Sequence, residues 1–450
     1  MRTLNNLEPV TAAVLERALD GAAPSRDEAY ALARSRGSEI SALLTTASLL
    51  RDRGWGRTIT YSRKVFIPLT NLCRDHCRYC TFAVSPTSPA ARTLTPDEVL
   101  TIARAGAAAG CKEALFSLGE KPEEVYERAR TDLRVLGHTT TTEYLAAMCR
   151  LVYEETGLMP HANCGVLERD EIQALRPWNV SMGLMLENIS DRLLGPGLAH
   201  AGSPGKEPAL RIKTIEDAGR MGVPFTTGIL IGIGETLEER IDSLFAIRDL
   251  HARAGNIQEV IVQNFRAKDD TPMRGDGEPS ALEMARTIAI ARLVLGAAMS
   301  IQAPPNLSPD AYGFYLLAGI NDWGGISPVT ADHINPEAPW PKIDELREIT
   351  ADAGFKLRER LAIYPSFQRS PETLREPFAT RVAALADESG YVRAELEGTA
   401  PAPRRREPSR PVARSGPAPL VLEDRYPGDP QANDRRITHD AAAAAQELHR

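Results

Sequence analysis

Between residue 64 and about residue 330, short apolar runs alternate with longer stretches of helical periodicity. The apolar runs predict eight strands, at 65–70, 112–118, 158–164, 180–186, 224–233, 259–265, 300–305 and 323–327. Eight strand–helix units over about 270 residues match the count and length of a (βα)8 TIM-type barrel. A doubly wound sheet would usually have fewer strands and a glycine-rich first turn, whereas this first turn is rich in cysteine. The predicted fold class is therefore α/β, with a closed parallel barrel.

Several of the stretches between the strands begin with helix-capping sequences. Thr95, Thr236 and Ser280 are each followed three residues later by glutamate, which is the capping-box pattern. Ser25 begins the same pattern within residues 8–55, a segment that also shows helical spacing of its apolar residues. We therefore expect helices both between the strands and before the first strand.

Composition divides the chain into four parts. Residues 1–59 are predicted to form an N-terminal helical extension, and residues 60–335 the barrel. Residues 336–398 are predicted to be a C-terminal helical segment, helical from about residue 340, packed on the outside of the barrel. Residues 399–450 are rich in proline and arginine and cannot bury a core, so we expect a linker or a disordered tail. Its arginines could contact RNA or a membrane, but a solvated linker is the favoured interpretation.

Three of the six cysteines, Cys73, Cys77 and Cys80, lie within eight residues directly after the first predicted strand. In a barrel that loop lies at the carboxyl-terminal end of the strands, where active sites are found. Three thiolates in a C-x3-C-x2-C spacing suit an iron–sulfur cube, because each ligates one iron and sulfur ligands favour soft metals. A cube has four irons, so one iron stays open to a small molecule. The spacing therefore indicates a cluster that can bind a substrate and act on it.

Other interpretations of the three cysteines stay open. A structural zinc site usually has four ligands in two pairs, and no second pair follows, although His76 could serve as a fourth ligand. A disulfide framework is disfavoured because the chain is long and three thiols leave one unpaired. Coincidence is a third alternative. The remaining cysteines stand in apolar or strand-like contexts and are expected to be buried small hydrophobes: Cys111, Cys149 and Cys164.

Charge and hydropathy exclude several classes of function. A net charge of −7 and an isoelectric point near 5.8 argue against nucleic acid as a main partner. No apolar stretch approaches the roughly 20 residues that span a bilayer, and the N-terminus lacks the apolar core of a signal peptide. We therefore expect no membrane partner, free thiols and a reducing, cytoplasmic location.

Polar residues follow several of the predicted strands at their carboxyl ends. Any one of them could be a solvated loop residue or a helix cap, but barrel geometry places all of them around one cavity. They are Glu120, Asn163, Glu187, Glu235, Gln263, Asn264 and Asn306.

The cysteine loop, with Tyr79 before its last cysteine, resembles the signature of radical S-adenosylmethionine (SAM) enzymes. In that superfamily SAM chelates the open iron through its amino and carboxylate groups, and an electron from the cluster releases a 5′-deoxyadenosyl radical. The resemblance implies one 4Fe-4S cluster per chain, SAM as a second cofactor and an electron donor as a partner. It assigns Cys73, Cys77 and Cys80 to the cluster and Tyr79 to the adenine of SAM.

From about residue 60 to residue 395 the chain also resembles the deazaflavin-forming FO synthases. The likeness is carried by the segments 61–68, 111–116, 232–236, 258–268, 302–307 and 322–328. It is specific to the subunit or domain that closes the ring of 7,8-didemethyl-8-hydroxy-5-deazariboflavin (FO), the precursor of coenzyme F-420. In that family a companion radical SAM enzyme joins the hydroxybenzyl group of tyrosine to a ribitylaminouracil. The ring-closing enzyme then cyclises this adduct with loss of ammonia.

Some members of that family carry both activities in one longer chain. This chain has one cysteine triplet, so the resemblance implies either a stand-alone subunit with a tail or a fragment of a fusion. In both cases we expect a small-molecule adduct as its substrate, and no FO from tyrosine without the companion enzyme.

The resemblance further implies which residues bind SAM. Gly119 and Glu120 stand where many relatives have a Gly-Gly-Glu that meets the amino group, although Leu118 replaces the first glycine. Glu187, at the end of the fourth predicted strand, is a candidate for the ribose.

Three later residues complete the implied SAM site. Arg211, after a Ser-Pro turn, resembles the arginine that pairs with the carboxylate of SAM; the alternative is a helix-surface residue. Gly232 and Gly234 lack the third glycine of a dinucleotide loop, so we expect a close backbone approach to adenosine there.

Other functions compete with the ring-closing lyase. The chain could instead be the companion coupling enzyme, or catalyse another radical SAM reaction such as sulfur insertion or menaquinone-precursor chemistry. Sulfur insertion normally needs a second cluster, and the sequence offers no further cysteine group. A non-enzyme alternative is a metal-bound scaffold that binds partners through its arginine-rich tail.

Overall fold

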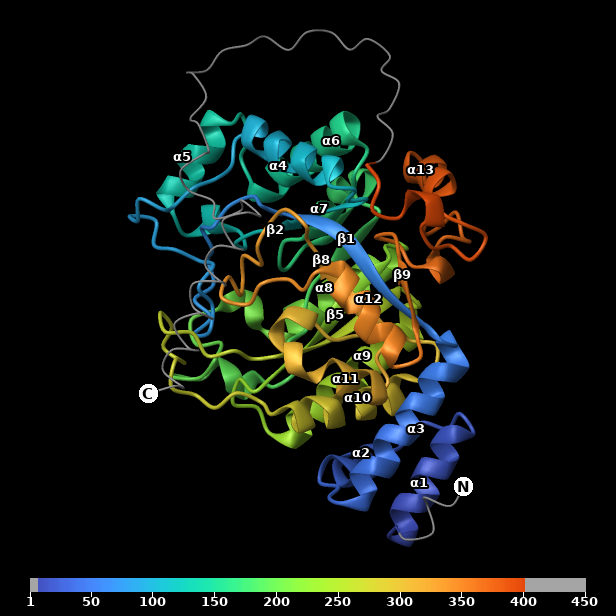
Figure 1. Ribbon diagram of the computed structural model, residues 1–450. Coiled ribbons are helices and arrows are strands. Elements are labelled where there is room, and N and C mark those ends of the chain that lie inside the picture. The colour runs from blue at the N-terminus through green and yellow to red at the C-terminus, as the bar shows by residue number, and fades with distance from the viewer. Residues whose placement is uncertain (1–6, 401–450) are drawn as a thin grey trace, which may run out of the picture.

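A computed structural model describes residues 7–400, and a closed barrel of eight parallel strands lies at its centre (Figure 1). The strands are β1 (Thr58–Pro68), β2 (Glu113–Ser117), β3 (Met159–Asn163), β4 (Ser181–Gly183), β5 (Phe225–Ile231), β6 (Ile257–Asn264), β7 (Ile301–Gln302) and β8 (Asp322–Ile326). All eight predicted strands are present, and the predicted (βα)8 class is confirmed. The largest difference in bounds is at β1, which begins at Thr58 rather than at residue 65.

Strand β1 closes the barrel by pairing with β2 on one edge and with β8 on the other. Lys64 lies opposite Glu113 in the first pairing, and Thr60 lies opposite Asp322 in the second. A ninth strand, β9 (Lys356–Glu359), runs parallel to the first residues of β1. Thr60 pairs with β8 on one side and with β9 on the other. Strand β9 therefore lies on the same edge of β1 as β2, which pairs with later residues of β1.

The prediction that the segment from residue 340 to residue 398 is helical is wrong in part. It contains α12 (Ile343–Asp352) and α13 (Phe378–Leu385), but β9 and irregular turns lie between them. Strand β9 is four residues long and carries three charged residues, so it has no apolar alternation. It forms because β1, about 300 residues earlier in the chain, offers an unpaired edge.

Helices surround the barrel. Those between its strands are α4 (Pro96–Ala108), α5 (Glu127–Val135), α6 (Thr141–Thr156), α7 (Arg169–Leu175), α8 (Pro208–Arg220), α9 (Leu237–Ala254), α10 (Ala281–Leu295) and α11 (Tyr312–Leu317). The predicted capping boxes at Ser25, Thr95, Thr236 and Ser280 all form. Each cap side chain accepts the backbone N–H three residues later, which satisfies a group that the helix itself leaves free.

The predicted N-terminal helices gather at one end of the molecule, as Figure 1 shows. They are α1 (Pro9–Leu19), α2 (Arg26–Ala33) and α3 (Ser38–Trp55). Helix α3 packs on α10 and α11, and α2 packs on α9 and α10. Between α2 and α9, the hydroxyl of Tyr30 donates a hydrogen bond of 2.7 Å to Asp242.

Apolar side chains fill the space between the barrel and its helices, whereas much of the barrel interior is polar. Gly106 of α4 approaches β1 so closely that a Cβ at Gly106 would lie 2.6 Å from the Cβ of Val65. Lys64, the neighbour of Val65, points the other way and lines an internal cavity together with Glu113. Barrels of this type are usually filled with branched aliphatic side chains. A polar interior therefore distinguishes this barrel and makes the cavity the candidate binding site.

Among residues 7–400, no helix combines the length and the apolarity needed to cross a membrane. The expected tail lies, from residue 401 onward, outside the described residues. The division of the chain into domains stays a prediction.

Candidate functional site

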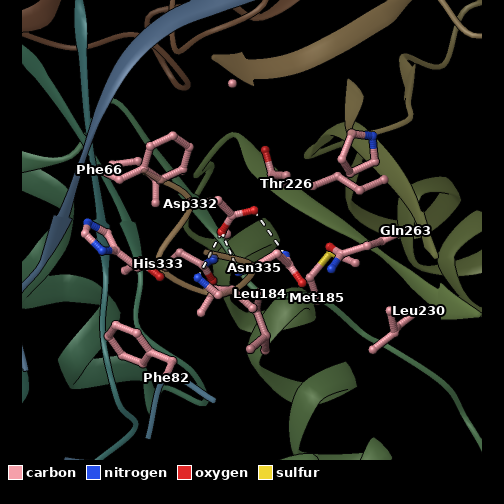
Figure 2. A pocket seen from close by; sticks show the side chains of 18 of the residues that line it. Phe66, Phe82, Leu184, Met185, Thr226, Leu230, Gln263, Asp332, His333 and Asn335 are labelled. Atoms are coloured by element: carbon pink, nitrogen blue, oxygen red, sulfur yellow. Dashed lines mark hydrogen bonds between the residues drawn. The ribbon is translucent and has the colours of Figure 1, made fainter. Parts of the chain in front are cut away.

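A cavity of about 320 Å³ occupies the interior of the barrel, and Figure 2 shows part of its lining. We call the end that the cysteine loop surrounds the mouth; its residues are Cys73, Asp75, Cys77, Tyr79, Cys80, Gly119, Glu120, Glu187, Lys206 and Arg211. We call the opposite end the floor; its residues are Lys64, Glu113, His161, Thr226, Gln258, Glu259, Gln302 and Arg360. Glu113 precedes the last residue of β2 by four positions, which places the floor roughly 13 Å below the strand ends.

The structure brings the three cysteines of the loop together at the mouth. All three are free thiols of intermediate exposure that line the cavity. The Sγ atom of Cys73 accepts hydrogen bonds from the backbone N–H groups of Asp75, at 3.4 Å, and Glu120, at 3.2 Å. The loop is thus tied to the end of β2, and the sulfur atom of Cys73 has two N–H donors beside it.

Gly119 permits the close contact between these two loops. A Cβ at this position would lie 1.8 Å from the carbonyl oxygen of Leu72 and 2.9 Å from the Cβ of Cys73. The backbone N–H of Gly119 donates to Thr70 at 2.8 Å, and that of Arg74 donates to Glu120 at 2.9 Å. Any larger residue would push the first cysteine away from its position.

The mouth has the chemistry that an iron–sulfur cube requires. Burial raises the pKa of Cys73 to about 12 and that of Cys77 to about 11, so both are protonated thiols when no metal is bound. Binding to iron displaces these protons, and donors such as those around Cys73 then stabilise the thiolate. Within residues 7–400, no three His, Cys, Asp or Glu side chains converge on a point suited to a single metal ion. A 4Fe-4S cube does not need three side chains that converge on one point, because each cysteine binds its own iron.

One side of the mouth is acidic. Glu120 is 5% exposed, and its carboxylate accepts hydrogen bonds from Arg74 at 2.7 and 3.2 Å. Asp75 accepts the backbone N–H of Gly205 at 2.8 Å. Burial raises the pKa of Glu120, and the nearby negative charge of Asp75 raises it further. A cation placed between these carboxyl groups would relieve both effects.

The other side of the mouth is basic. Lys206 Nζ lies 2.5 Å from Glu187 Oε1, and Arg211 Nη2 lies 3.8 Å from the same oxygen. Burial works to raise the pKa of Glu187, but Lys206 and Arg211 outweigh it, so the pKa lies below its usual value. Arg211 is 3% exposed and donates to the carbonyl groups of Met185 and Gly205, at 2.7 and 2.6 Å. The alternative that Arg211 is a helix-surface residue is therefore wrong.

Tyr79 joins the mouth to an apolar cluster beside β5. Its ring packs against the cluster that contains Leu230 and Phe265, and its hydroxyl lies 3.2 Å from His200 Nε2. Burial raises the pKa of Tyr79 well above its usual value and lowers that of His200 to about 3. Both groups are therefore neutral, and Tyr79 offers a largely apolar face to the cavity.

Other predicted residues lie away from the cavity. Gly232 and Gly234 have φ angles of +89° and +92° and shape the loop after β5, but neither lines the cavity. The prediction that Glu235 faces the cavity is wrong: its carboxylate accepts the N–H of Gly232 and pairs with Arg240 at 2.7 Å. Asn264 is turned to the carbonyl of Leu307, at 3.3 Å, and does not line the cavity either. The other predicted strand-end residues line it: Glu120, Asn163, Glu187, Gln263 and Asn306.

Between the mouth and the floor the cavity has an apolar wall, which we define as Phe66, Phe82, Leu115, Leu184, Leu230 and Trp340. Phe66 stacks on Trp340 with ring centroids 5.1 Å apart and planes within 9°. Beside them Asp332 accepts a hydrogen bond from Asn335 Nδ2 at 3.1 Å, which Figure 2 shows. This middle region suits an aromatic or aliphatic part of a ligand.

Charge pairs occupy the floor. Lys64 pairs with Glu113 at 2.8 Å, and Arg360 pairs with Glu259 at 2.9 Å and with Asp322 at 2.6 Å. Lys64 and Arg360 are 6% and 2% exposed. Arg360 directly follows β9, so the unpredicted strand is what delivers it to the barrel. The floor is thus a built polar surface rather than a layer of aliphatic packing.

Asp75, Lys206 and the residues of the floor are not among the site residues predicted from the sequence. Inward-facing polar residues at alternate positions of a predicted strand are the signal that could have found part of the floor. His161 and Asn163 of β3 show this spacing. Arg360 carries no such signal, because its strand is not readable from the sequence.

Comparison with known proteins identifies a family. The model of the radical SAM superfamily matches residues 67–247. The FO synthase of Streptomyces avermitilis is 51% identical over 384 residues, which are 83% of this chain and 45% of that protein. The 7,8-didemethyl-8-hydroxy-5-deazariboflavin synthase of Methanopyrus kandleri is 49% identical over 335 residues, which are 74% of this chain and 100% of that protein. The chain thus spans about half the length of the FO synthases it matches and the whole of the M. kandleri protein.

Solved structures support the fold. The FeFe-hydrogenase maturase HydG from Carboxydothermus hydrogenoformans superposes with a TM-score of 0.64 at 19% identity, over 78% of this chain and 80% of that one. At this level of identity the likeness shows the fold alone.

Proposed function

This chain belongs to the 7,8-didemethyl-8-hydroxy-5-deazariboflavin synthase family of radical SAM enzymes, and we propose that it catalyses the ring-closing step of FO formation. In this proposal it is a lyase that converts 5-amino-5-(4-hydroxybenzyl)-6-(D-ribitylimino)uracil to FO. Ammonia, methionine and 5′-deoxyadenosine are released. The observation that carries the proposal is the match to the whole length of the M. kandleri protein at 49% identity. A companion radical SAM enzyme supplies the adduct, and an electron donor supplies the reducing electron.

Cys73, Cys77 and Cys80 would hold a 4Fe-4S cluster at the mouth, because they line the cavity together and Cys73 is already surrounded by N–H donors. When bound, the cluster and SAM together supply the 5′-deoxyadenosyl radical that begins the reaction. Gly119 keeps the first cysteine in place by allowing the loop after β2 to approach it. The loop's part in the reaction is therefore to fix the position of the cluster.

The two sides of the mouth match the two charges of the amino acid end of SAM. The acidic side, Glu120 with Asp75, suits the ammonium group. The basic side, Lys206 with Arg211, suits the carboxylate, because Arg211 is buried, the Lys206 side chain is only 13% exposed, and both make charge-assisted bonds. Glu187 lies beside these cations and can accept a ribose hydroxyl, and Tyr79 offers its ring to the adenine.

The barrel also protects a radical from solvent. The cysteine loop surrounds the mouth of the cavity, and the apolar wall around Phe66 and Leu184 lines its middle. A dry site prevents side reactions of a reactive intermediate. The chain's own contribution to the chemistry is thus orientation of the adduct and exclusion of water.

The test is an anaerobic assay of the cluster-loaded protein with SAM, dithionite and adduct made by a companion enzyme. We expect FO fluorescence together with equal amounts of 5′-deoxyadenosine and ammonia. Given only tyrosine and the ribitylaminouracil, the chain should give no FO. An intact cluster that cleaves SAM in the presence of adduct but forms no FO would contradict the proposal. FO formed from tyrosine by this chain alone would show that it also carries the coupling activity.

A further inference from the structure

The floor contains a histidine whose protonation state can be deduced from its neighbours. His161, on β3, is 5% exposed, and its Nδ1 atom lies 2.7 Å from the hydroxyl oxygen of Ser181. Ser181 gives its only hydroxyl hydrogen to the carbonyl of Ala362, at 2.8 Å. The oxygen of Ser181 must therefore accept from His161, which puts the imidazole hydrogen on Nδ1. The hydrogen-bond pattern thus leaves Nε2 as a bare acceptor.

This acceptor faces the cavity and has no partner among the residues that the structure describes. The space in front of it is kept open by Gly183, where a Cβ would lie 2.8 Å from Nε2 of His161. Burial lowers the pKa of His161 to about 4, which keeps the ring neutral and Nε2 free to accept. Buried polar atoms are nearly always paired in native proteins, so a free acceptor in a cavity calls for a ligand.

A second free group lies across the barrel. Gln302, on β7, is 6% exposed and lines the same cavity, and its amide makes no hydrogen bond within residues 7–400. In the strand order of the barrel, β7 stands four strands from β3, which is the opposite side. The amide can both donate and accept. The charged residues between them are already paired with one another, so the floor has two unmet partners that face each other across the cavity.

We propose that the floor binds the pyrimidine-dione end of the substrate, with His161 Nε2 accepting a ring N–H and the Gln302 amide meeting a carbonyl or ribityl hydroxyl opposite. This inference rests on the proposed function, which supplies the adduct as the ligand. The pyrimidine-dione carries an N–H donor between two carbonyl acceptors, and the attached polyol adds hydroxyl groups. The hydroxybenzyl end is mostly apolar and suits the apolar wall above, where Phe66 stacks on Trp340. The order along the cavity is then cluster and SAM at the mouth, aromatic ring in the middle, and pyrimidine at the floor.

The experiment measures binding rather than turnover. FO keeps the pyrimidine-dione and the ribityl chain and is fluorescent, so it is titrated into the full, cluster-loaded chain without SAM. His161→Leu and Gln302→Leu should each weaken FO binding by tenfold or more. His161→Gln should lose less, because its amide oxygen can still accept a hydrogen bond. His251→Gln is the matched control: this histidine lies on α9 outside the cavity, accepts the N–H of Ile257 at 3.2 Å, and should bind FO normally.

Two further arms separate recognition from a structural role. Ser181→Ala keeps the imidazole but frees its hydrogen to move to Nε2, so FO binding should weaken although the ring remains. In the second arm, 5-amino-6-ribitylaminouracil and 4-hydroxytoluene each compete with FO for the chain. His161→Leu should weaken the binding of 5-amino-6-ribitylaminouracil and leave the binding of 4-hydroxytoluene unchanged. Iron content is measured for every variant, because a misfolded variant will not hold the cluster. Such a variant is set aside, and the correctly loaded variants test the inference.

The outcomes distinguish this inference from the function on which it rests. If FO binds the wild type and both leucine variants equally well, the floor does not hold the pyrimidine end and the inference is wrong, while the proposed function stands. Equal weakening of both competitors by His161→Leu would also overturn it, since the effect would then be structural. If FO fails to bind the wild-type chain, the inference is wrong, and the anaerobic assay of FO formation decides the proposed function separately.

Discussion

The mouth and the floor of the barrel are both polar, yet they are built differently. The mouth stands on loops, and its three cysteines are only partly buried, with two backbone hydrogen bonds to the sulfur of Cys73. The floor stands on strands, and its charges are almost fully buried and neutralise one another. Loops can position ligands for a metal at little cost to the fold, whereas paired charges inside a barrel are part of its packing. Changes at the mouth should therefore damage chemistry, and changes at the floor should damage stability or substrate affinity.

The largest effect is expected from the cysteines of the mouth. Replacing Cys73, Cys77 or Cys80 with alanine should remove the cluster, since each thiolate ligates its own iron, and should abolish FO formation. The wild-type chain should bind about four irons and four sulfides after anaerobic reconstitution. Cys149→Ala should retain them, because Cys149 is a buried residue of α6 whose thiol donates to Asn179 Oδ1 at 3.5 Å, away from the cavity. Iron and sulfide assays decide the matter, and tight stoichiometric zinc without iron uptake would contradict the account.

At the floor the next largest effect is expected on stability. Lys64→Met leaves the carboxylate of Glu113 buried without its cation, which should lower the free energy of unfolding by about 3–5 kcal/mol. The double variant Lys64→Met with Glu113→Gln should recover much of this loss, because no unpaired charge remains. Urea unfolding followed by circular dichroism measures both. If the single and double variants are equally destabilised, the pair is not what holds this part of the barrel.

How much the sequence reveals also differs between the two regions. The cysteine loop, Gly119 and the capping boxes are local patterns, and each is readable from a few neighbouring residues. Arg360 reaches the floor only through β9, whose pairing partner lies about 300 residues earlier in the chain. No local pattern contains that contact, so neither β9 nor this half of the floor could be predicted.

The error at Glu235 has the same origin. Its position after β5 predicts a side chain directed at the cavity, as is observed for Glu187 after β4. Arg240, five residues further along, instead pairs with Glu235. The Glu235 carboxylate then accepts the backbone N–H of Gly232 and holds that loop in place. Position on a barrel strand thus predicts where a residue stands, but the nearest countercharge decides where its carboxylate points.

A moderate effect is expected for SAM binding at the basic side of the mouth. Arg211→Ala should weaken SAM affinity by about 1.5–3 kcal/mol, the scale of a charge-assisted hydrogen bond. Arg211→Lys should lie between wild type and alanine, because it keeps the charge but not the planar fork. The change in the EPR signal of the reduced cluster on SAM addition gives the affinity. An unchanged affinity in Arg211→Ala, with normal iron content, would remove Arg211 from the SAM site.

The smallest effect is expected for the hydroxyl of Tyr79. Tyr79→Phe removes only the contact with His200 at 3.2 Å and keeps the ring, so SAM affinity should change by about 1 kcal/mol or less. Tyr79→Ala removes the ring as well and should lower SAM affinity by clearly more. The same EPR titration compares the two. Equal losses in both variants would mean that the hydroxyl, and not the aromatic face, is what the site uses.

The central claim is that one cavity holds the radical chemistry at its mouth and the pyrimidine end of the ligand at its floor. A crystal structure of the cluster-loaded chain, grown anaerobically with SAM and FO, tests it most directly. The account predicts a cube on Cys73, Cys77 and Cys80, and FO deeper in the barrel with a ring nitrogen within about 3.2 Å of His161 Nε2. FO bound outside the barrel, or inside it with its pyrimidine ring turned toward the cysteines, would contradict the account.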